Sequence, residues 1–439
     1  MERFQLRTKL LVLLIAVSFI NCNPFAKKEK NDNSAALAAL LLSSSASYTI
    51  NPTAGETICD GTGKGSPTTV TGDISSSTTW SGAVLLSGTV TVKSGATLTV
   101  SPGTTVYGQT GSSLFIVQGA KLNAIGTATL PICFTSAKSP GLRAPGDWGG
   151  VVLIGNAVGS RTAVTEGVNK LAYGSGTDDT DSSGTLKYVI VEFAGNEVSA
   201  GDELNGISSY TVGSGTTYDY VQVHRGLDDG FETWGGKLQG THMVVTGGMD
   251  DDFDMDEGFH GSFQYLIGVK YPTACGGTAS SDPHGMEMDG VHSGGNCSVS
   301  SGCSNPTVSN YVLIGQSVTN SYAERHREGM AGTFTNGISY QFTKGPVCDN
   351  SSAYPATTSA FSNVASDIAL TNNSSCTGTV SATITKLPVT SLGGIDAINC
   401  GNSATKPDFN TVSDYTSFVG AVDSSVANWW SGWTVYRGK

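Results

Sequence analysis

A repeat of about 22 to 24 residues is the feature of this sequence that most restricts its fold. The pattern Gly-Ala-x-Leu occurs at residues 95–98 and again at 119–122. Three short apolar segments, at 220–225, 242–246 and 264–270, follow one another at nearly the same interval. Such periods are typical of solenoids and propellers, but a propeller blade needs about 40 residues. The repeat therefore predicts a parallel β-helix, in which each coil consists of short strands joined by turns.

The composition agrees with a large all-β body that is rich in turns. Glycine supplies 57 of the 439 residues, and charged residues make up only 14 % of the chain. Strong helix formers are too sparse for a bundle, and a hydrophobic content of 38 % is too high for a disordered chain. The formal net charge of -12 argues against a nucleic-acid partner, because phosphate recognition needs a basic surface.

Residues one coil apart are expected to stack into ladders along the β-helix. At the offset of about 22 residues, Phe231 falls over Phe253 and Glu232 falls over Asp254. We expect the two phenylalanines to lie inside the coil, where stacked repeats bury a continuous apolar core.

Three tryptophans stand close together near the C-terminus, namely Trp429, Trp430 and Trp433. An open β-helix end needs an apolar cover, so we expect these residues to plug the last coil. A platform on which a carbohydrate stacks is the alternative, because tryptophan combines a large apolar face with a polar edge.

Residues 1–21 have the organisation of a bacterial export signal. Three basic residues precede an apolar run from Leu10 to Ile20, which is too short to span a membrane as a helix. Cys22 follows directly, as in the looser lipoprotein signals of spirochaetes. An ordinary signal peptide followed by an incidental cysteine is the alternative. We expect a lipid on Cys22, with palmitate as one of its acyl chains. A lipid with more than one acyl chain would anchor the protein stably.

Residues 22–56 show no strand alternation, and we interpret them as a flexible tether. This leaves residues 57–439 for the β-helix domain with its Trp-rich C-terminal cap. The organisation predicts a chain that is attached to the cell envelope by its N-terminal lipid. The expected location is the outer membrane or the cell surface.

The remaining cysteines favour disulfides in an exported chain. Their number is even, and no C-x-x-C pair or Cys/His cluster indicates zinc. We expect four disulfides, and pairing of Cys297 with Cys303 would close a short local loop. The candidates are Cys59, Cys133, Cys275, Cys297, Cys303, Cys348, Cys376 and Cys400.

Acidic side chains are concentrated between residues 201 and 269, where the only basic residues are Arg225 and Lys237. In residues 252–256 the alternation has period two, so Phe253 and Met255 should face one side and three carboxylates the other. Carboxylates stacked ~5 Å apart repel by roughly 1 kcal/mol per pair in water, and by more when partly desolvated. Few cations lie nearby in the sequence to offset this repulsion.

A bound cation would neutralise such a cluster, and Ca²⁺ suits flexible sets of carboxylate and carbonyl oxygens. We therefore expect calcium in a structural role. The alternative is a solvated acidic face with Asp-capped turns. The candidate ligands are Asp228, Asp229, Glu232, Asp250, Asp251, Asp252, Asp254, Asp256 and Glu257.

Several motifs resemble a group of bacterial exported lipoproteins that fold as right-handed parallel β-helices and have no established biochemical activity. The matching stretches include Gly146-Asp-Trp-Gly-Gly150, Asp228-Asp-Gly-Phe-Glu232, Asp251-Asp-Phe-Asp-Met-Asp-Glu-Gly258 and Trp430-Ser-Gly-Trp-Thr434. The resemblance covers about Trp80 to the C-terminus, and the eight cysteines depart from the family pattern. It implies a single-stranded, right-handed, pectin-lyase-like solenoid with end caps and a surface location. It brings no catalytic residues.

Two functions stay open at this stage. The first is a calcium-stabilised binding, adhesion or structural module of the cell envelope, with an extracellular protein or a glycan as its ligand. The second is a polysaccharide lyase or glycoside hydrolase, because many parallel β-helix proteins cleave polysaccharides. Carboxylates one coil apart could provide the ~5–9.5 Å separation that glycosidases need. The segments 258–261 and 325–327 also resemble the His and Arg elements of pectin-cleaving hydrolases.

Overall fold

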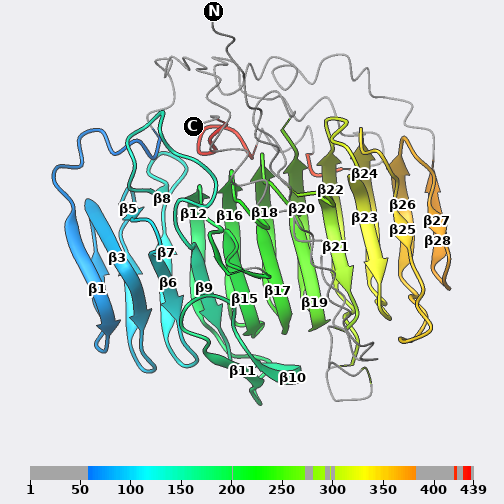
Figure 1. The fold of residues 1–439 in the computed structure, drawn as a ribbon, viewed down its shortest axis with the longest axis horizontal. Coiled ribbons are helices and arrows are strands. Elements are labelled where there is room, and N and C mark those ends of the chain that lie inside the picture. Colours follow the sequence, from blue (N-terminus) through cyan, green and yellow to red (C-terminus); the bar gives the residue numbers. More distant parts are fainter. Residues whose placement is uncertain are drawn as a thin grey trace, which may run out of the picture.

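The computed structural model describes residues 58–199, 201–271, 280–291, 297, 302–381, 420–422 and 429–436. This part of the chain consists of β-strands and turns, which form a long stack of parallel coils (Figure 1). No helix among the described residues is long and apolar enough to cross a membrane. The predicted signal peptide, Cys22 and the whole predicted tether lie outside the described residues.

Three parallel ladders run along the stack and form the faces of the coil. The first ladder joins β2 (Thr78–Trp80), β4 (Thr97–Val100) and β7 (Lys121–Ile125) to the first half of β12 (Gly184–Glu192). The second joins the first half of β3 (Ala83–Val92), β5 (Thr105–Gly108) and β8 (Ile132–Ser136) to the second half of β12. Beyond β12 both ladders continue through the same strands. These are β16 (Thr217–His224), β18 (Gln239–Thr246), β20 (Ser262–Val269), β22 (Thr307–Ile314), β24 (Thr333–Tyr340), β26 (Ala360–Ser366) and β28 (Thr377–Ser381).

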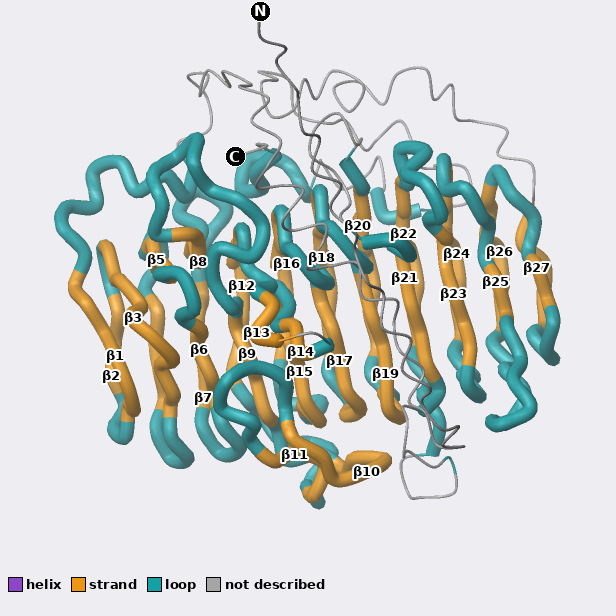
Figure 2. Tube along the Cα trace, in the orientation of Figure 1, coloured by secondary structure: helices purple, strands orange, loops and turns teal. Residues whose placement is uncertain are grey.

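The third ladder carries the candidate site. From the second half of β3 it runs through β6 (Ser113–Ile116), β9 (Val151–Ile154), β15 (Ile207–Val212), β17 (Phe231–Gly236), β19 (Phe253–Phe259), β21 (His284–Asp289), β23 (Tyr322–Arg327), β25 (Val347–Cys348) and β27 (Thr371–Asn372). The first strand, β1 (Thr68–Ile74), pairs with β3 at the N-terminal end. Two antiparallel pairs lie outside the coils (Figure 2): β10 (Val158–Val164) with β11 (Ala172–Ser175), and β13 (Glu197–Ser199) with β14 (Asp202–Glu203). The predicted right-handed parallel β-helix is confirmed.

A column of left-handed residues marks the bend between the first and second faces. Tyr188, Tyr220, His242 and Tyr265 occupy one register position and have φ angles between 49° and 59°. Positive φ is uncommon for residues with a side chain, so each position needs a compensating interaction. Here the rings stack, with centroids 4.5, 4.2 and 4.9 Å apart from one coil to the next. The stacked rings offset the strain of turning the chain at this corner.

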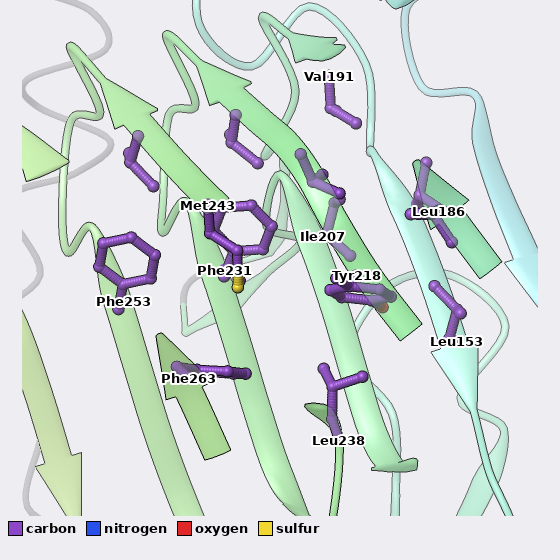
Figure 3. Close-up of a cluster of buried hydrophobic side chains, with 14 of the residues drawn as sticks. Leu153, Leu186, Val191, Ile207, Tyr218, Phe231, Leu238, Met243, Phe253 and Phe263 are labelled. Carbon is purple, nitrogen blue, oxygen red and sulfur yellow. The ribbon is translucent and has the colours of Figure 1, made fainter. Parts of the chain in front are cut away.

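The interior of the coil is filled by aligned apolar side chains (Figure 3). Phe231 pairs with Phe253 in register, and their rings are parallel within 3° with centroids 5.7 Å apart. Both side chains are buried. The predicted phenylalanine ladder inside the coil is therefore confirmed, as is the alignment of Glu232 with Asp254.

The three C-terminal tryptophans do not cover the last coil, so this prediction is wrong. They pack against the flank of the central coils, where Trp433 contacts Tyr188 and Tyr220 edge-on at 5.8 and 6.1 Å. Gln222 holds the same segment through two hydrogen bonds to the backbone of Val435, of 2.7 and 2.8 Å. The aromatic column offers an apolar surface there, and all three tryptophans are buried against it.

The described residues contain three disulfides. Cys297 pairs with Cys303, as expected from the short loop between them. Cys59 pairs with Cys133 and Cys348 with Cys376, which ties together segments 74 and 28 residues apart. The remaining candidates, Cys275 and Cys400, lie outside the described residues.

Candidate functional site

Two columns of charged side chains point outward from the third ladder. We call them the acidic columns, and their members are set by the strand register. The first contains Glu232, Asp254, Glu287 and Arg325, and the second contains Asp256, Asp289 and Arg327. The period-two alternation of β19 positions Asp254 and Asp256 here, because Phe253 and Met255 face the core.

The acidic columns are buried, although they point out of the coil. The exposed fractions are 9 % for Glu232, 5 % for Asp254, 6 % for Asp256 and 5 % for Glu287. A solvated acidic face is therefore wrong for these residues. Burial, and then the neighbouring carboxylates, raise the pKa of Glu232 and of Asp254 well above the usual range.

A hairpin formed by β10 and β11 covers part of this face. Tyr173 on β11 packs on Tyr210, which in turn stacks on Trp234 with ring centroids 4.1 Å apart. The hydroxyl of Tyr173 donates a 2.8 Å hydrogen bond to Glu257, and Arg161 on β10 forms an ion pair with the same carboxylate. Glu257, a predicted metal ligand, is thus held by the hairpin.

The turn before each strand is tied to the next coil by side-chain hydrogen bonds. Asn205 accepts from the backbone N–H of Asp229 at 3.1 Å, and Asp229 accepts from that of Asp251 at 2.9 Å. Asp251 then accepts from the backbone N–H of His284 at 2.5 Å. Asp229 and Asp251 therefore tie their turns to the following coil, 22 and 33 residues on, and these bonds account for part of the acidic motif.

Few cations lie near the acids in the sequence, but arginines from a later coil lie beside them in the structure. Arg327 donates to Oε2 of Glu287 at 2.5 Å and also pairs with Asp289. Arg325 lies 3.5 Å from Oε1 of Glu287. These arginines follow their partners by 38 to 40 residues, so sequence proximity could not reveal the pairing.

Asp252 does not join the acidic columns, so the predicted face of three carboxylates is wrong at this position. Its Oδ1 lies 3.0 Å from Nζ of Lys270, and both side chains have an exposure of 0 %. Burial raises the pKa of Asp252 to about 6, against the opposing effect of Lys270. The pair is a structural contact between the acidic turn and the second face.

Three groups of carboxylates bring oxygens within 4.8 Å of one another, as a metal ion requires. They are Asp228, Asp229 and Asp250; Asp229, Glu232 and Asp254; and Asp251, Asp254 and Glu287. Six of the nine predicted ligands belong to these groups, whereas Asp252, Asp256 and Glu257 do not. Within the part of the chain that the structure describes, Oδ1 of Asp254 has no hydrogen-bond partner although it is buried.

Sequence reasoning missed several residues of this site, namely Glu166, Lys270, Glu287, Asp289 and the pairing role of Arg325 and Arg327. A signal for two of them was present. The segment Met286-Glu-Met-Asp289 repeats the alternation of Phe253-Asp-Met-Asp256 and occupies the next strand of the ladder. Glu166, whose charge helps burial to raise the pKa of Glu232, could not be found this way, because it belongs to the loop between β10 and β11.

We predict that Lys270→Met lowers the free energy of unfolding by about 3–5 kcal/mol at pH 7, because it leaves Asp252 as a buried, unpaired charge. The loss should shrink toward pH 5. When the folded state raises the pKa of a carboxyl group, the protein loses stability as the pH rises through that pKa. It regains this stability when the carboxyl group is protonated at lower pH. Urea unfolding at both pH values measures this, with the exposed Lys93→Met as the matched control. An equal loss for both variants would contradict the assignment.

Comparison with known proteins agrees with this architecture. A family model described as a pectate-lyase-like β-helix domain matches residues 72–434. Searches of curated proteins and of solved structures gave no match. The matched region covers most of the chain and includes every strand of the acidic columns. The chain therefore belongs to the pectate-lyase-like β-helix domain family.

Proposed function

We propose that this protein is a calcium-stabilised binding or structural module that is anchored to a bacterial cell envelope by a lipid on Cys22. The β-helix would present its long polar faces to an extracellular protein or a glycan. The observation that carries the calcium assignment is the convergence of buried carboxylate oxygens from Asp229, Glu232 and Asp254. One of these residues, Asp254, has a buried Oδ1 without a hydrogen-bond partner among the described residues.

The charge balance of this group supports a cation. Burial, and then the neighbouring carboxylates, raise the pKa of Glu232 and of Asp254, so a bound cation would stabilise their ionised forms. Arg325 and Arg327 pair with Glu287 and Asp289 one coil further on. A group made only of oxygens, part of it on turns, suits Ca²⁺ better than a transition metal.

The half-buried group of Asp228, Asp229 and Asp250 supports a second calcium position on the same turns. Asp228 and Asp250 lie one coil apart and are more accessible than the members of the acidic columns. Calcium at this position would bind together two coils whose turns otherwise concentrate like charges. Its role would be structural, because it would hold the register of the acidic turns.

A polysaccharide-degrading enzyme is the second candidate. It is favoured by the family and by the spacing of Asp229, Glu232 and Asp254, whose oxygens approach the ~5–5.5 Å separation of retaining glycosidases. It is disfavoured by burial, since a sugar must reach the carboxylates. A lyase would also need a neutral base. Burial alone would lower the pKa of Arg327, but the nearby carboxylates of Glu287 and Asp289 raise it well above the usual value. Arg327 therefore stays protonated and cannot act as this base.

The calcium proposal is tested by thermal unfolding of the full chain after chelation with EDTA. We predict a Tm several degrees below that of the untreated protein, and recovery with Ca²⁺ but not with Mg²⁺. At calcium concentrations of 100 times Kd, binding contributes about 2.7 kcal/mol. The Ca²⁺ step is essential because EDTA also removes other metals. Asp228→Asn should reduce the recovery, whereas Asp282→Asn, at an exposed aspartate outside the three groups, should not. An unchanged Tm after chelation would contradict the proposal.

The enzyme candidate is tested by incubating the protein with acidic and neutral glycans in the presence of Ca²⁺. We predict no release of reducing ends and no unsaturated uronate absorbance. Cleavage that disappears in Asp254→Asn would overturn the binding assignment. The same variant should be checked for folding by circular dichroism, so that lost activity is not confused with unfolding.

Lipid anchoring is tested in cells that are fed labelled palmitate. We predict incorporation into the wild-type chain and none into Cys22→Ser, because acylation requires this thiol. Cys59→Ser is the matched control, since Cys59 lies in the disulfide with Cys133 and should not affect labelling. Equal labelling of wild type and Cys22→Ser would show that the anchor is elsewhere.

A further inference from the structure

His284 begins strand β21 and lies at the edge of the acidic columns. Its side chain is fully buried, with an exposure of 0 %. Nε2 lies 3.1 Å from Oε1 of Glu287. In contrast, Nδ1 makes no hydrogen bond in the described part of the chain and lies 4.0 Å from Oδ1 of Asp251. One nitrogen is therefore held by a carboxylate, and the other is directed at a second carboxylate without bonding to it.

The carboxylates around this histidine converge as metal ligands do. Asp251, Asp254 and Glu287 are all buried and offer oxygens within 4.8 Å of one another. Oδ1 of Asp254 has no hydrogen-bond partner among the described residues. Two buried donor atoms, this oxygen and Nδ1 of His284, thus have lone pairs that no hydrogen bond uses.

The backbone holds these side chains in place from two adjacent coils. The N–H of His284 donates to Oδ1 of Asp251 at 2.5 Å, and the N–H of Asp252 donates to the carbonyl of His284 at 3.1 Å. Asp254 and Glu287 are direct partners in the ladder between β19 and β21. Two adjacent coils therefore hold the backbone of these residues in a fixed arrangement.

An imidazole donor changes the cation that such a site prefers. Ca²⁺ takes oxygen ligands, whereas imidazole together with carboxylates suits Zn²⁺. In a tetrahedral zinc site a nitrogen and an oxygen ligand lie roughly 3.4 Å apart, given bonds of about 2.1 Å. The observed 4.0 Å between Nδ1 of His284 and Oδ1 of Asp251 is within a small rotation of this value.

The opposite nitrogen of His284 is arranged as in known metal sites. Metal-bound histidines usually donate their other ring N–H to a carboxylate, which fixes the tautomer and the ring orientation. Glu287 lies at that position, and its two oxygens are in turn approached by Arg325 and Arg327. The arginines would keep Glu287 ionised and in position.

We propose that Nδ1 of His284 and the carboxylates of Asp251 and Asp254 bind Zn²⁺, with Glu287 orienting the imidazole. This zinc site goes beyond the calcium function proposed above and shares only Asp254 with its ligands. The competing account is an imidazolium that forms ion pairs with Asp251 and Glu287. Burial opposes this charge, but both carboxylates raise the pKa of His284.

The test is calorimetric titration of Zn²⁺ into the full chain, purified in detergent and freed of metal. We predict binding of one zinc ion that is weakened roughly 100-fold or more in His284→Gln. Glu287→Gln, which removes the orienting carboxylate, should cost about 10–100-fold. His242→Gln is the matched control, because His242 also contacts a carboxylate, Asp219 at 2.9 Å, but on another face. Its zinc affinity should be unchanged.

Replacing a fully buried histidine can unfold the protein, so the wild-type chain must supply an independent measurement. Co²⁺ bound at this site should give visible absorption bands and an X-ray absorption shell that contains one nitrogen ligand. Zn²⁺ should displace it, and a large excess of Ca²⁺ should not. Absence of zinc binding, displacement of Co²⁺ by Ca²⁺, a shell without nitrogen, or equal losses in His284→Gln and His242→Gln would each overturn the zinc site. None of these outcomes affects the recovery of Tm by Ca²⁺ that tests the calcium proposal.

Discussion

Register between successive coils is the constraint on which the rest of this structure depends. Parallel backbone hydrogen bonds place each residue about 4.8 Å from its equivalent in the next coil. The same alignment has opposite consequences for different side chains. It stacks Phe231 on Phe253 inside the coil, where the contact stabilises the core. It also places Glu232, Asp254 and Glu287 in one column, where like charges repel.

The protein offsets this repulsion in several ways that differ along the column. At the turns, Asp229 and Asp251 accept hydrogen bonds from backbone N–H groups of the following coil, which offset part of their charge. Toward the C-terminal end, Arg325 and Arg327 occupy the same columns as the acids. Between these regions, Glu232 and Asp254 have no arginine of their own in the described contacts. Glu232 accepts a hydrogen bond from the side chain of Asn205, and we propose that a metal ion completes the stabilisation of both carboxylates at neutral pH.

Much of the fold could be predicted from sequence, because the spacing of a repeat indicates which residues align in successive coils. The spacing of about 22 residues was enough to align Phe231 with Phe253 and to predict the β-helix. The candidate acids were found for the same reason. The environment of Glu257 could not be predicted, because Tyr173 and Arg161, which hold it, belong to the β10–β11 hairpin outside the repeat.

The repeat also did not predict contacts between residues on different faces of the coil. Lys270 lies just past the acidic segment in the sequence and forms a buried ion pair with Asp252. Alternation along one strand therefore predicted the wrong face for Asp252. Likewise, the C-terminal tryptophans follow an aromatic column formed by Tyr188, Tyr220 and their neighbours. That column exists only because the chain takes left-handed conformations at one corner of each coil. The repeat aligns these rings one coil apart, but it does not show that the C-terminal segment packs against them.

The central claim is that a bound cation, and not a set of protons, neutralises the buried acids of the central coils. A crystal structure of the full chain grown at neutral pH with Ca²⁺ tests this most directly. We predict an ion about 2.3–2.6 Å from carboxylate oxygens of Asp229, Glu232 and Asp254. A structure without an ion, in which Glu232 and Asp254 share a proton through a short carboxyl–carboxylate hydrogen bond, would contradict the account.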